Sequence, residues 1–75
     1  MKEFYDIEND EFHSKRFPNK SEYEFKVYVL ESYTEAGFSS REEVVGYFST
    51  KEKAIDYLNS NKVEGQVSIY PIFVK

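Results

Sequence analysis

Positively charged side chains alternate with aromatic rings at two places in this 75-residue chain. Such a combination can hold a phosphate by charge while a ring stacks on a nucleobase. The predicted phosphate-binding residues are Arg16, Lys20 and Arg41, and the predicted stacking residues are Phe17, Tyr23 and Phe38. The alternative is that these rings cap a small core and that the cations are solvated. The pattern therefore indicates a phosphorylated, nucleotide-like ligand without naming it.

Catalytic chemistry has few candidates. His13 is the one histidine, and acid–base work through it would need a carboxylate or a nucleophile nearby. The chain has no cysteine, which excludes a thiol nucleophile and disfavours a zinc site. Its three glycines are isolated, so none forms a phosphate-cradling loop. Glu42 and Glu43 would point to opposite faces of a strand. We expect no enzyme, no metal and no cofactor.

The net charge of −4 is concentrated at one end of the chain. Residues 1–12 hold one base and five acids, which gives −4, whereas residues 13–75 hold nine bases and nine acids. This balance disfavours a general nucleic-acid binder, which needs a basic surface. The acidic opening could instead mimic a phosphate backbone toward a DNA-binding protein. The alternative is a mobile, solvated arm.

Regular structure is predicted from Tyr23 onward. Residues 23–30 alternate between apolar and polar side chains in a β-branched, aromatic run, which predicts a strand that could continue to Tyr33. Residues 34–40 are expected to form a loop in which Gly37 is free to take a positive φ. A second strand over about residues 42–48 would complete an antiparallel hairpin.

A helix and a last strand follow. Ser49 and Glu52 fit a capping box, with Thr50 as an alternative cap one residue later. Apolar side chains then recur at three- and four-residue spacings and predict a helix that buries one face: Ala54, Ile55, Tyr57 and Leu58. The last strand spans residues 66–74. Pro71 lacks an N–H, so we expect this strand to be an edge strand or to carry a bulge at Pro71.

These elements predict an α+β fold, in which one helix packs on a small, mainly antiparallel sheet with the order β-β-α-β from Tyr23. We expect a single domain over residues 1–75, because a chain of this length holds one core. Residues 1–22 are expected to be an irregular acidic segment, with a short strand or turn near residues 4–7, before the core of residues 23–75. No apolar run approaches the roughly 20 residues that span a bilayer, and the N-terminus lacks the apolar run of a signal peptide.

Residues 44–58 carry a module of strand, Phe48-Ser49-Thr50 and helix. The module resembles one that occurs in small accessory proteins of bacteriophages and low-GC bacteria, over about a fifth of the chain. Such proteins often bind and neutralise a host component, for example as nuclease inhibitors or as sponges for nucleotide signals of bacterial defence. The resemblance implies a bacterial host and transfers no binding residue, and the lack of a membrane-spanning run and of a signal peptide predicts a cytoplasmic location there.

Three functional hypotheses follow. The first is sequestration of a phosphorylated small ligand, such as a cyclic nucleotide, by a homo-oligomer. The second is inhibition of a host nuclease or another DNA-binding protein, through the acidic arm or an exposed strand edge. The third is an interaction module without a ligand of its own. Pro71 and the apolar last strand also offer an edge or a face that a homo-oligomer could bury.

Overall fold

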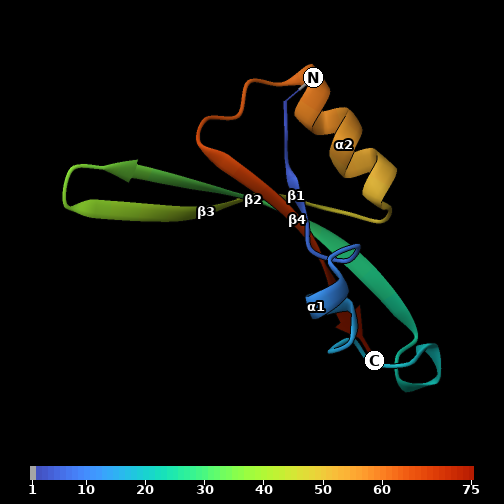
Figure 1. The fold of residues 1–75 in the computed structure, drawn as a ribbon. Coiled ribbons are helices and arrows are strands. Elements are labelled where there is room, and N and C mark those ends of the chain that lie inside the picture. The colour runs from blue at the N-terminus through green and yellow to red at the C-terminus, as the bar shows by residue number, and fades with distance from the viewer. Residues whose placement is uncertain (1) are drawn as a thin grey trace.

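A computed structural model describes residues 2–75 and shows a small α+β fold: a four-stranded, mostly antiparallel sheet with one helix packed on it (Figure 1). The strand order is β1-β4-β2-β3, and only the β1–β4 pair is parallel. The predicted fold class is therefore confirmed. The strands are β1 (Tyr5–Asp6), β2 (Phe25–Ala36), β3 (Ser39–Phe48) and β4 (Gln66–Val74), and the helices are α1 (Glu11–Ser14), the 3₁₀ helix η1 (Lys20–Glu22) and α2 (Lys51–Ser60).

The hairpin of β2 and β3 is longer than predicted. The expected loop over residues 34–40 is wrong, because Ala36 pairs with Ser39 and leaves a turn of only two residues, Gly37 and Phe38. Gly37 has φ +65° and Phe38 has a negative φ, as a type II′ turn requires. The second strand thus begins at Ser39 rather than near Glu42. The apolar pattern of the sequence did not predict the ends of these strands, because their side chains are polar there. The tight turn keeps the two strands paired in spite of this.

Helix α2 begins at the alternative cap. The Thr50 hydroxyl accepts a hydrogen bond from the Lys53 amide at 3.2 Å, so Thr50 rather than Ser49 is the N-cap. The helix buries Ala54 and Leu58, which lie one turn apart. Tyr57 remains partly exposed and packs against the ring of Phe48 at 5.5 Å between centroids.

The core lies between α2 and one face of the sheet, which we call the helix face. Register places Tyr28 and Leu30 of β2 and Val67 and Ile69 of β4 on this face, where they pack with α2. A bulge in β3 leaves Val45 without a register partner, between Gly46 opposite Leu30 and Val44 opposite Glu31, and Val45 packs against the core. A Cβ at Gly46 would lie 3.1 Å from the ring of Phe48, so glycine makes room for that ring.

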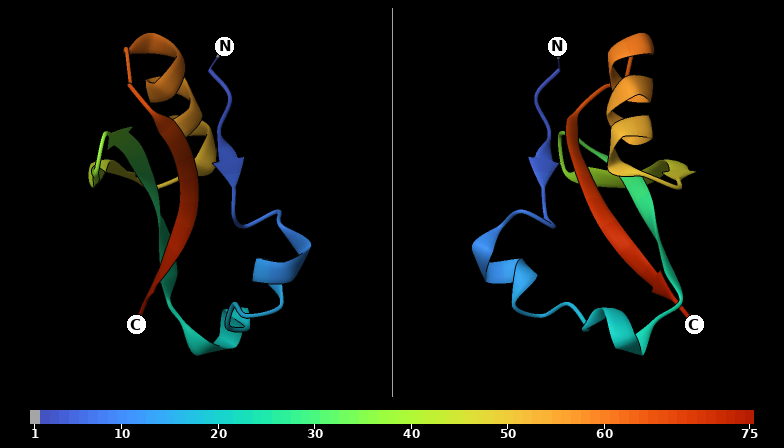
Figure 2. Two further views of the ribbon diagram at one scale, coloured as in Figure 1. Left: turned by 60° about the vertical axis from the view of Figure 1, so that its left-hand side comes forward. Right: turned by 90° about the vertical axis from the view of Figure 1, so that its right-hand side faces the viewer.

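The N-terminal segment covers the rest of the helix face. It contains β1, α1 and η1 and runs beside the sheet to the start of β2 (Figure 2). The short strand expected near residues 4–7 is present, whereas the two short helices were not predicted. Asp10 caps α1 by accepting from the amides of Phe12 and His13.

Pro71 lies where β4 has lost its neighbour. The Ile69 carbonyl accepts from the Ile7 amide across the β1 edge, so Pro71, two residues on, faces the same edge after β1 has ended. Its missing N–H therefore breaks no described ladder bond. The expectation that the last strand is an edge or carries a bulge at Pro71 is therefore wrong, because β4 lies between β1 and β2 in unbroken register, and the proline is tolerated because β1 ends before it reaches Pro71.

Candidate functional site

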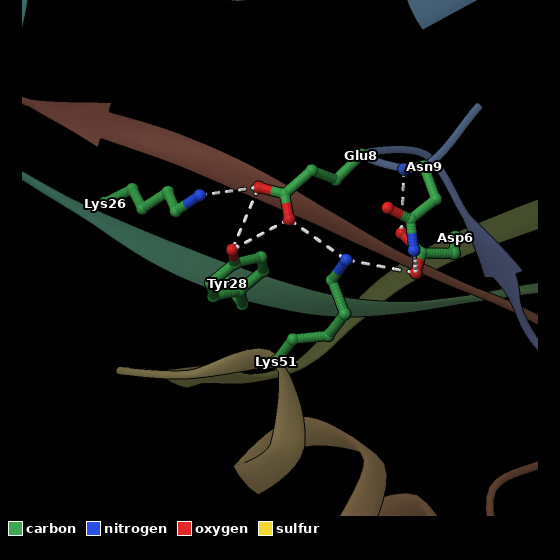
Figure 3. A network of polar contacts seen from close by, with 6 residues as sticks. All are labelled: Asp6, Glu8, Asn9, Lys26, Tyr28 and Lys51. Carbon is green, nitrogen blue, oxygen red and sulfur yellow. Dashed lines mark hydrogen bonds and ion pairs between the residues drawn. The ribbon is translucent and has the colours of Figure 1, made fainter. Parts of the chain in front are cut away.

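The acidic opening is attached to the sheet by a network of ion pairs (Figure 3). The Glu8 carboxylate accepts from Lys26 at 2.9 Å, from the Tyr28 hydroxyl at 2.9 Å and from Lys51 at 3.0 Å. Lys51, at the start of α2, also contacts Asp6 at 3.1 Å. The interpretation of this segment as a mobile, solvated arm is therefore wrong for Asp6 and Glu8, which join β1 and the following turn to β2 and α2.

Electrostatics favour the charged forms in this network. Partial burial by itself would raise the pKa of Glu8, but hydrogen bonds from Lys26, Lys51 and Tyr28 outweigh it and hold that pKa below its usual value. The hydrogen bond to Glu8 raises the pKa of Lys26. Burial by itself would lower the pKa of Lys51. The contacts with Glu8 and Asp6 raise it by more, so the pKa of Lys51 lies above its usual value. The network is chemically satisfied and offers no free nucleophile or base.

Four of the predicted ligand residues lie together at the end of the sheet where β4 ends. Phe17 and Tyr23 pack against Phe73, at 5.5 and 4.7 Å between ring centroids. Arg16 stacks over the ring of Phe12 at 4.4 Å, and Lys20 is exposed in η1. Phe17 and Tyr23, two of the three predicted stacking residues, thus contribute to packing on the helix face. Of the four residues, only Tyr23 lines the pocket at this end, which Glu22 and Lys75 also line.

The other two predicted residues lie at the opposite end of the molecule. Phe38 is fully exposed at the tip of the β2–β3 hairpin, and Arg41 is exposed on β3, paired in register with Thr34. Figure 1 shows this hairpin projecting away from α1 and the C-terminus. One chain therefore does not bring all six predicted residues around a single ligand.

The β2–β3 hairpin has geometry suited to binding. β2 pairs with β4 only as far as Tyr33, so residues 34–41 pair only within the hairpin and project from the body. β3 is the edge of the sheet, and its outer side carries no described strand. Over residues 34–43 three acids stand against one base, which gives a charge of −2: Glu35, Glu42 and Glu43 against Arg41.

A second surface is the face of the sheet opposite α2, which the sequence indicated only through its apolar last strand. It carries exposed aromatic side chains such as Tyr47 and Phe25. The signal was present in β4, where Tyr70, Ile72 and Val74 are apolar at alternate positions while Val67, Ile69 and Phe73 are apolar at the others. A strand that is apolar on both sides is typical of a sheet covered on both faces.

Catalytic and metal chemistry gain no new candidate. His13 in α1 lies edge-on to the rings of Tyr5 and Phe12, and its Nδ1 is 3.2 Å from the Asp10 carboxylate, which also accepts from the Tyr5 hydroxyl. Among residues 2–75 no group of three acidic or histidine side chains could hold a metal ion. No helix in the described part of the chain is long and apolar enough to cross a membrane.

Comparisons with known proteins give no relative: no protein-family model, no curated protein and no solved structure matches this chain.

Proposed function

We propose that this chain is a non-catalytic binding protein that holds a partner protein through the β2–β3 hairpin. The observation that carries the proposal is the projecting hairpin, with the fully exposed ring of Phe38 at its tip and the unpaired edge of β3 alongside it. An exposed edge strand can accept a strand of a partner, while a protruding aromatic ring can fill a pocket.

The charge of the hairpin defines the kind of partner. With Glu35, Glu42 and Glu43 against Arg41, it fits a protein with a basic surface, as nucleases and other DNA-binding proteins have. The resemblance to phage accessory proteins supports the same role, an inhibitor of a host protein. Asp6 and Glu8 support it less, because their charges are already compensated by Lys51 and Lys26.

Site-specific photo-crosslinking tests this proposal. A benzophenone side chain replaces Phe38, and a matched protein carries it at Phe12, which is also aromatic and 63% exposed but lies in α1. In a lysate of the source cell we expect one protein adduct from position 38 and none from position 12. The adduct should weaken as salt is raised and with the double charge reversal Glu42→Lys and Glu43→Lys. Equal adducts from both positions, or none from position 38, would contradict the proposal.

Sequestration of a phosphorylated ligand is the second candidate function. Its site would contain fewer residues than the six predicted, because Phe38 and Arg41 lie at the other end of the molecule. The observation in its favour is that Phe17 and Tyr23 both pack on Phe73 near the end of β4, in the same stretch of chain as Arg16 and Lys20. Native mass spectrometry of the gently purified protein, alone and with a cyclic dinucleotide, tests it. A retained nucleotide-sized mass that Arg16→Ala removes would favour sequestration; binding that Arg16→Ala and Arg41→Ala leave unchanged would count against it.

A further inference from the structure

The sheet face opposite α2, which we call the open face, is apolar along most of its length. Register assigns it nine apolar or aromatic residues from three strands: Phe25, Val27, Val29, Tyr33, Val44, Tyr47, Tyr70, Ile72 and Val74. Val29 at its centre is fully buried by its neighbours, but Tyr47 is 64% exposed, Phe25 53%, Val44 42% and Ile72 41%. Soluble monomers rarely leave so continuous an apolar patch in water.

We propose that the open face is an interface with the open face of a second copy of this chain, related by a twofold axis that runs across the strands. The dimer would have four layers, with the two sheets packed together in the middle and one α2 on each outer side. The proposal does not rest on the proposed function: the dimer contact is made by the apolar side chains of the open face, whereas the proposed function uses Phe38 at the tip of the hairpin and the outer edge of β3.

The size of the chain favours a second copy over an occasional partner. A 75-residue protein has a small core, which here consists of seven buried apolar residues. Domains of this size commonly add disulfides, a metal or a subunit interface to reach stability. The chain has no cysteine, and its described residues offer no metal cluster. A face that is apolar in the free protein therefore fits a permanent contact.

The area of the open face is sufficient for a small specific dimer. Nine residues of β2 pair with β4, from Phe25 to Tyr33, and three strands lie side by side over much of that length. With a rise of about 3.3 Å per residue and a spacing of about 4.8 Å between strands, plus the width of the side chains, the face measures roughly 600 Å². Two such faces bury about 1,200 Å², the lower limit for a standard specific interface.

Charge at the two ends of the sheet sets the direction of the axis. The hairpin end of the open face is acidic, with Glu31, Glu35 and Glu42 in register on it. At the opposite end of the open face the residues in register are uncharged, Phe25 and Val74. An axis across the strands places each acidic end over the partner's uncharged end. An axis along the strands would place acid on acid.

Analytical ultracentrifugation of the purified protein tests the dimer. We expect twice the chain mass of 8.9 kDa at high micromolar concentration, with dissociation on dilution. Ile72→Asp and Tyr47→Asp place a charge on the open face at positions exposed in one chain, so each should fold and raise the dissociation constant at least tenfold. Phe12→Asp, at an exposed ring outside the face, is the matched control and should leave the dimer unchanged.

The result that overturns the proposal is a wild-type monomer up to the high micromolar range, or a dimer that Ile72→Asp and Tyr47→Asp do not weaken. Circular dichroism confirms that each variant is folded, and a folded Tyr47→Asp monomer supports the proposal even where Ile72→Asp fails to fold. Crosslinking from Phe38 to a partner in the absence of a dimer would refute this inference and leave the proposed function intact.

Spin labels test the orientation, since the chain has no native cysteine to interfere. A label on Phe38→Cys marks the tip of each hairpin. With the proposed axis the tips lie at opposite ends of the dimer, on the order of 50 Å apart from the strand rise on either side of Val29. With an axis along the strands the two labels would approach the roughly 10 Å that separates packed sheets. The short distance would refute the proposed arrangement.

Discussion

The Glu8 side chain ties the N-terminal segment to both β2 and α2. It contacts Lys26 and Tyr28 on β2 and Lys51 on α2 from a segment that has few other polar ties to the sheet. Its side chain is 21% exposed, which makes the contacts stronger than those of a surface pair but weaker than those of a buried one. The loss of this carboxylate therefore leaves two cations without their shared partner.

We expect Glu8→Gln to lower the free energy of unfolding at pH 7 by about 1–2 kcal/mol, a value discounted for partial exposure. Because folding lowers the pKa of Glu8 from its ordinary value of 4.5, its contribution is complete above that value and is lost as the pH falls below it. The difference between wild type and variant in urea unfolding should therefore shrink from pH 7 to pH 3. Glu64→Gln, at an exposed position, is the control, and a pH-independent difference would contradict the role assigned to the charge.

Asp10 should make the protein sensitive to stronger acid. The hydrogen bond from the Tyr5 hydroxyl, followed by that from the His13 amide, lowers the pKa of Asp10 from 3.8 to about 2. A lowered pKa in the folded state means that the stability it supplies is present above pH 3.8 and disappears as the pH falls toward 2. In thermal unfolding, wild type should lose stability between pH 4 and pH 2 more steeply than Asp10→Asn. Identical slopes would exclude this carboxylate as the cause.

Two glycines with positive φ should respond very differently to a methyl group. At Gly65, with φ +84°, a Cβ would lie 2.2 Å from the Tyr33 carbonyl oxygen, whereas at Gly37, with φ +65°, nothing lies within 4 Å. Gly65→Ala should destabilise the fold by about 2–3 kcal/mol, since it adds a backbone clash to the left-handed conformation. Gly37→Ala should cost about 1 kcal/mol, which reflects the conformation alone. Equal losses in urea unfolding would show that the close approach at Gly65 relaxes.

At the scale of elements, the parts that could be predicted are those with strong local signals. The alternation of apolar and polar residues predicted β2, and apolar residues at three- and four-residue spacings predicted α2. Apolar residues at both sets of alternate positions predicted β4. The attachment of the N-terminal segment could not be predicted, because Glu8 meets its partners 18 and 20 residues away in β2. Composition alone favours a charged, solvated arm for the acidic residues at the start of the chain. For the same reason, the separation of Arg41 and Phe38 from Arg16 and Phe17 depends on the length of the hairpin, which local patterns underestimated.

The start of α2 gives a test at this scale. The sequence allows two caps, and the structure uses Thr50, whose hydroxyl accepts from Lys53. Thr50→Ala should lower the free energy of unfolding by about 1 kcal/mol, the usual loss of an N-cap, while Ser49→Ala should change it by only a few tenths of a kcal/mol. Urea unfolding of both variants checks the assignment. A larger loss in Ser49→Ala would restore the capping box of Ser49 and Glu52.

At the scale of the whole molecule, the helix face and the open face of the sheet differ in how completely their side chains are buried. Helix α2 and the N-terminal segment cover the helix face, so that Leu30 and Ile69 are fully buried. The open face buries only Val29 to that extent, with the cross-strand neighbours Tyr47 and Tyr70 beside it. The Tyr70 hydroxyl donates to Glu31 at 2.8 Å, which satisfies these two polar groups, whereas the apolar side chains around Val29, such as Tyr47 and Phe25, stay exposed to water.

A dimer through the open face would make thermal stability depend on protein concentration. When two folded chains associate and unfolded chains do not, mass action stabilises the folded state as the concentration rises. For a domain of this size each tenfold increase should raise Tm by about 3–5 °C. Scanning calorimetry of wild type over two decades of concentration should show this rise, and Ile72→Asp should show a Tm that is lower and constant. Below the dissociation constant the chain is monomeric, and the Tm of the wild type should not depend on concentration there. The calorimetry must therefore begin above the dissociation constant that ultracentrifugation measures. A constant Tm in that range would mean that association does not stabilise the fold, and that the exposed side chains of the open face are tolerated by a core that is sufficient without them.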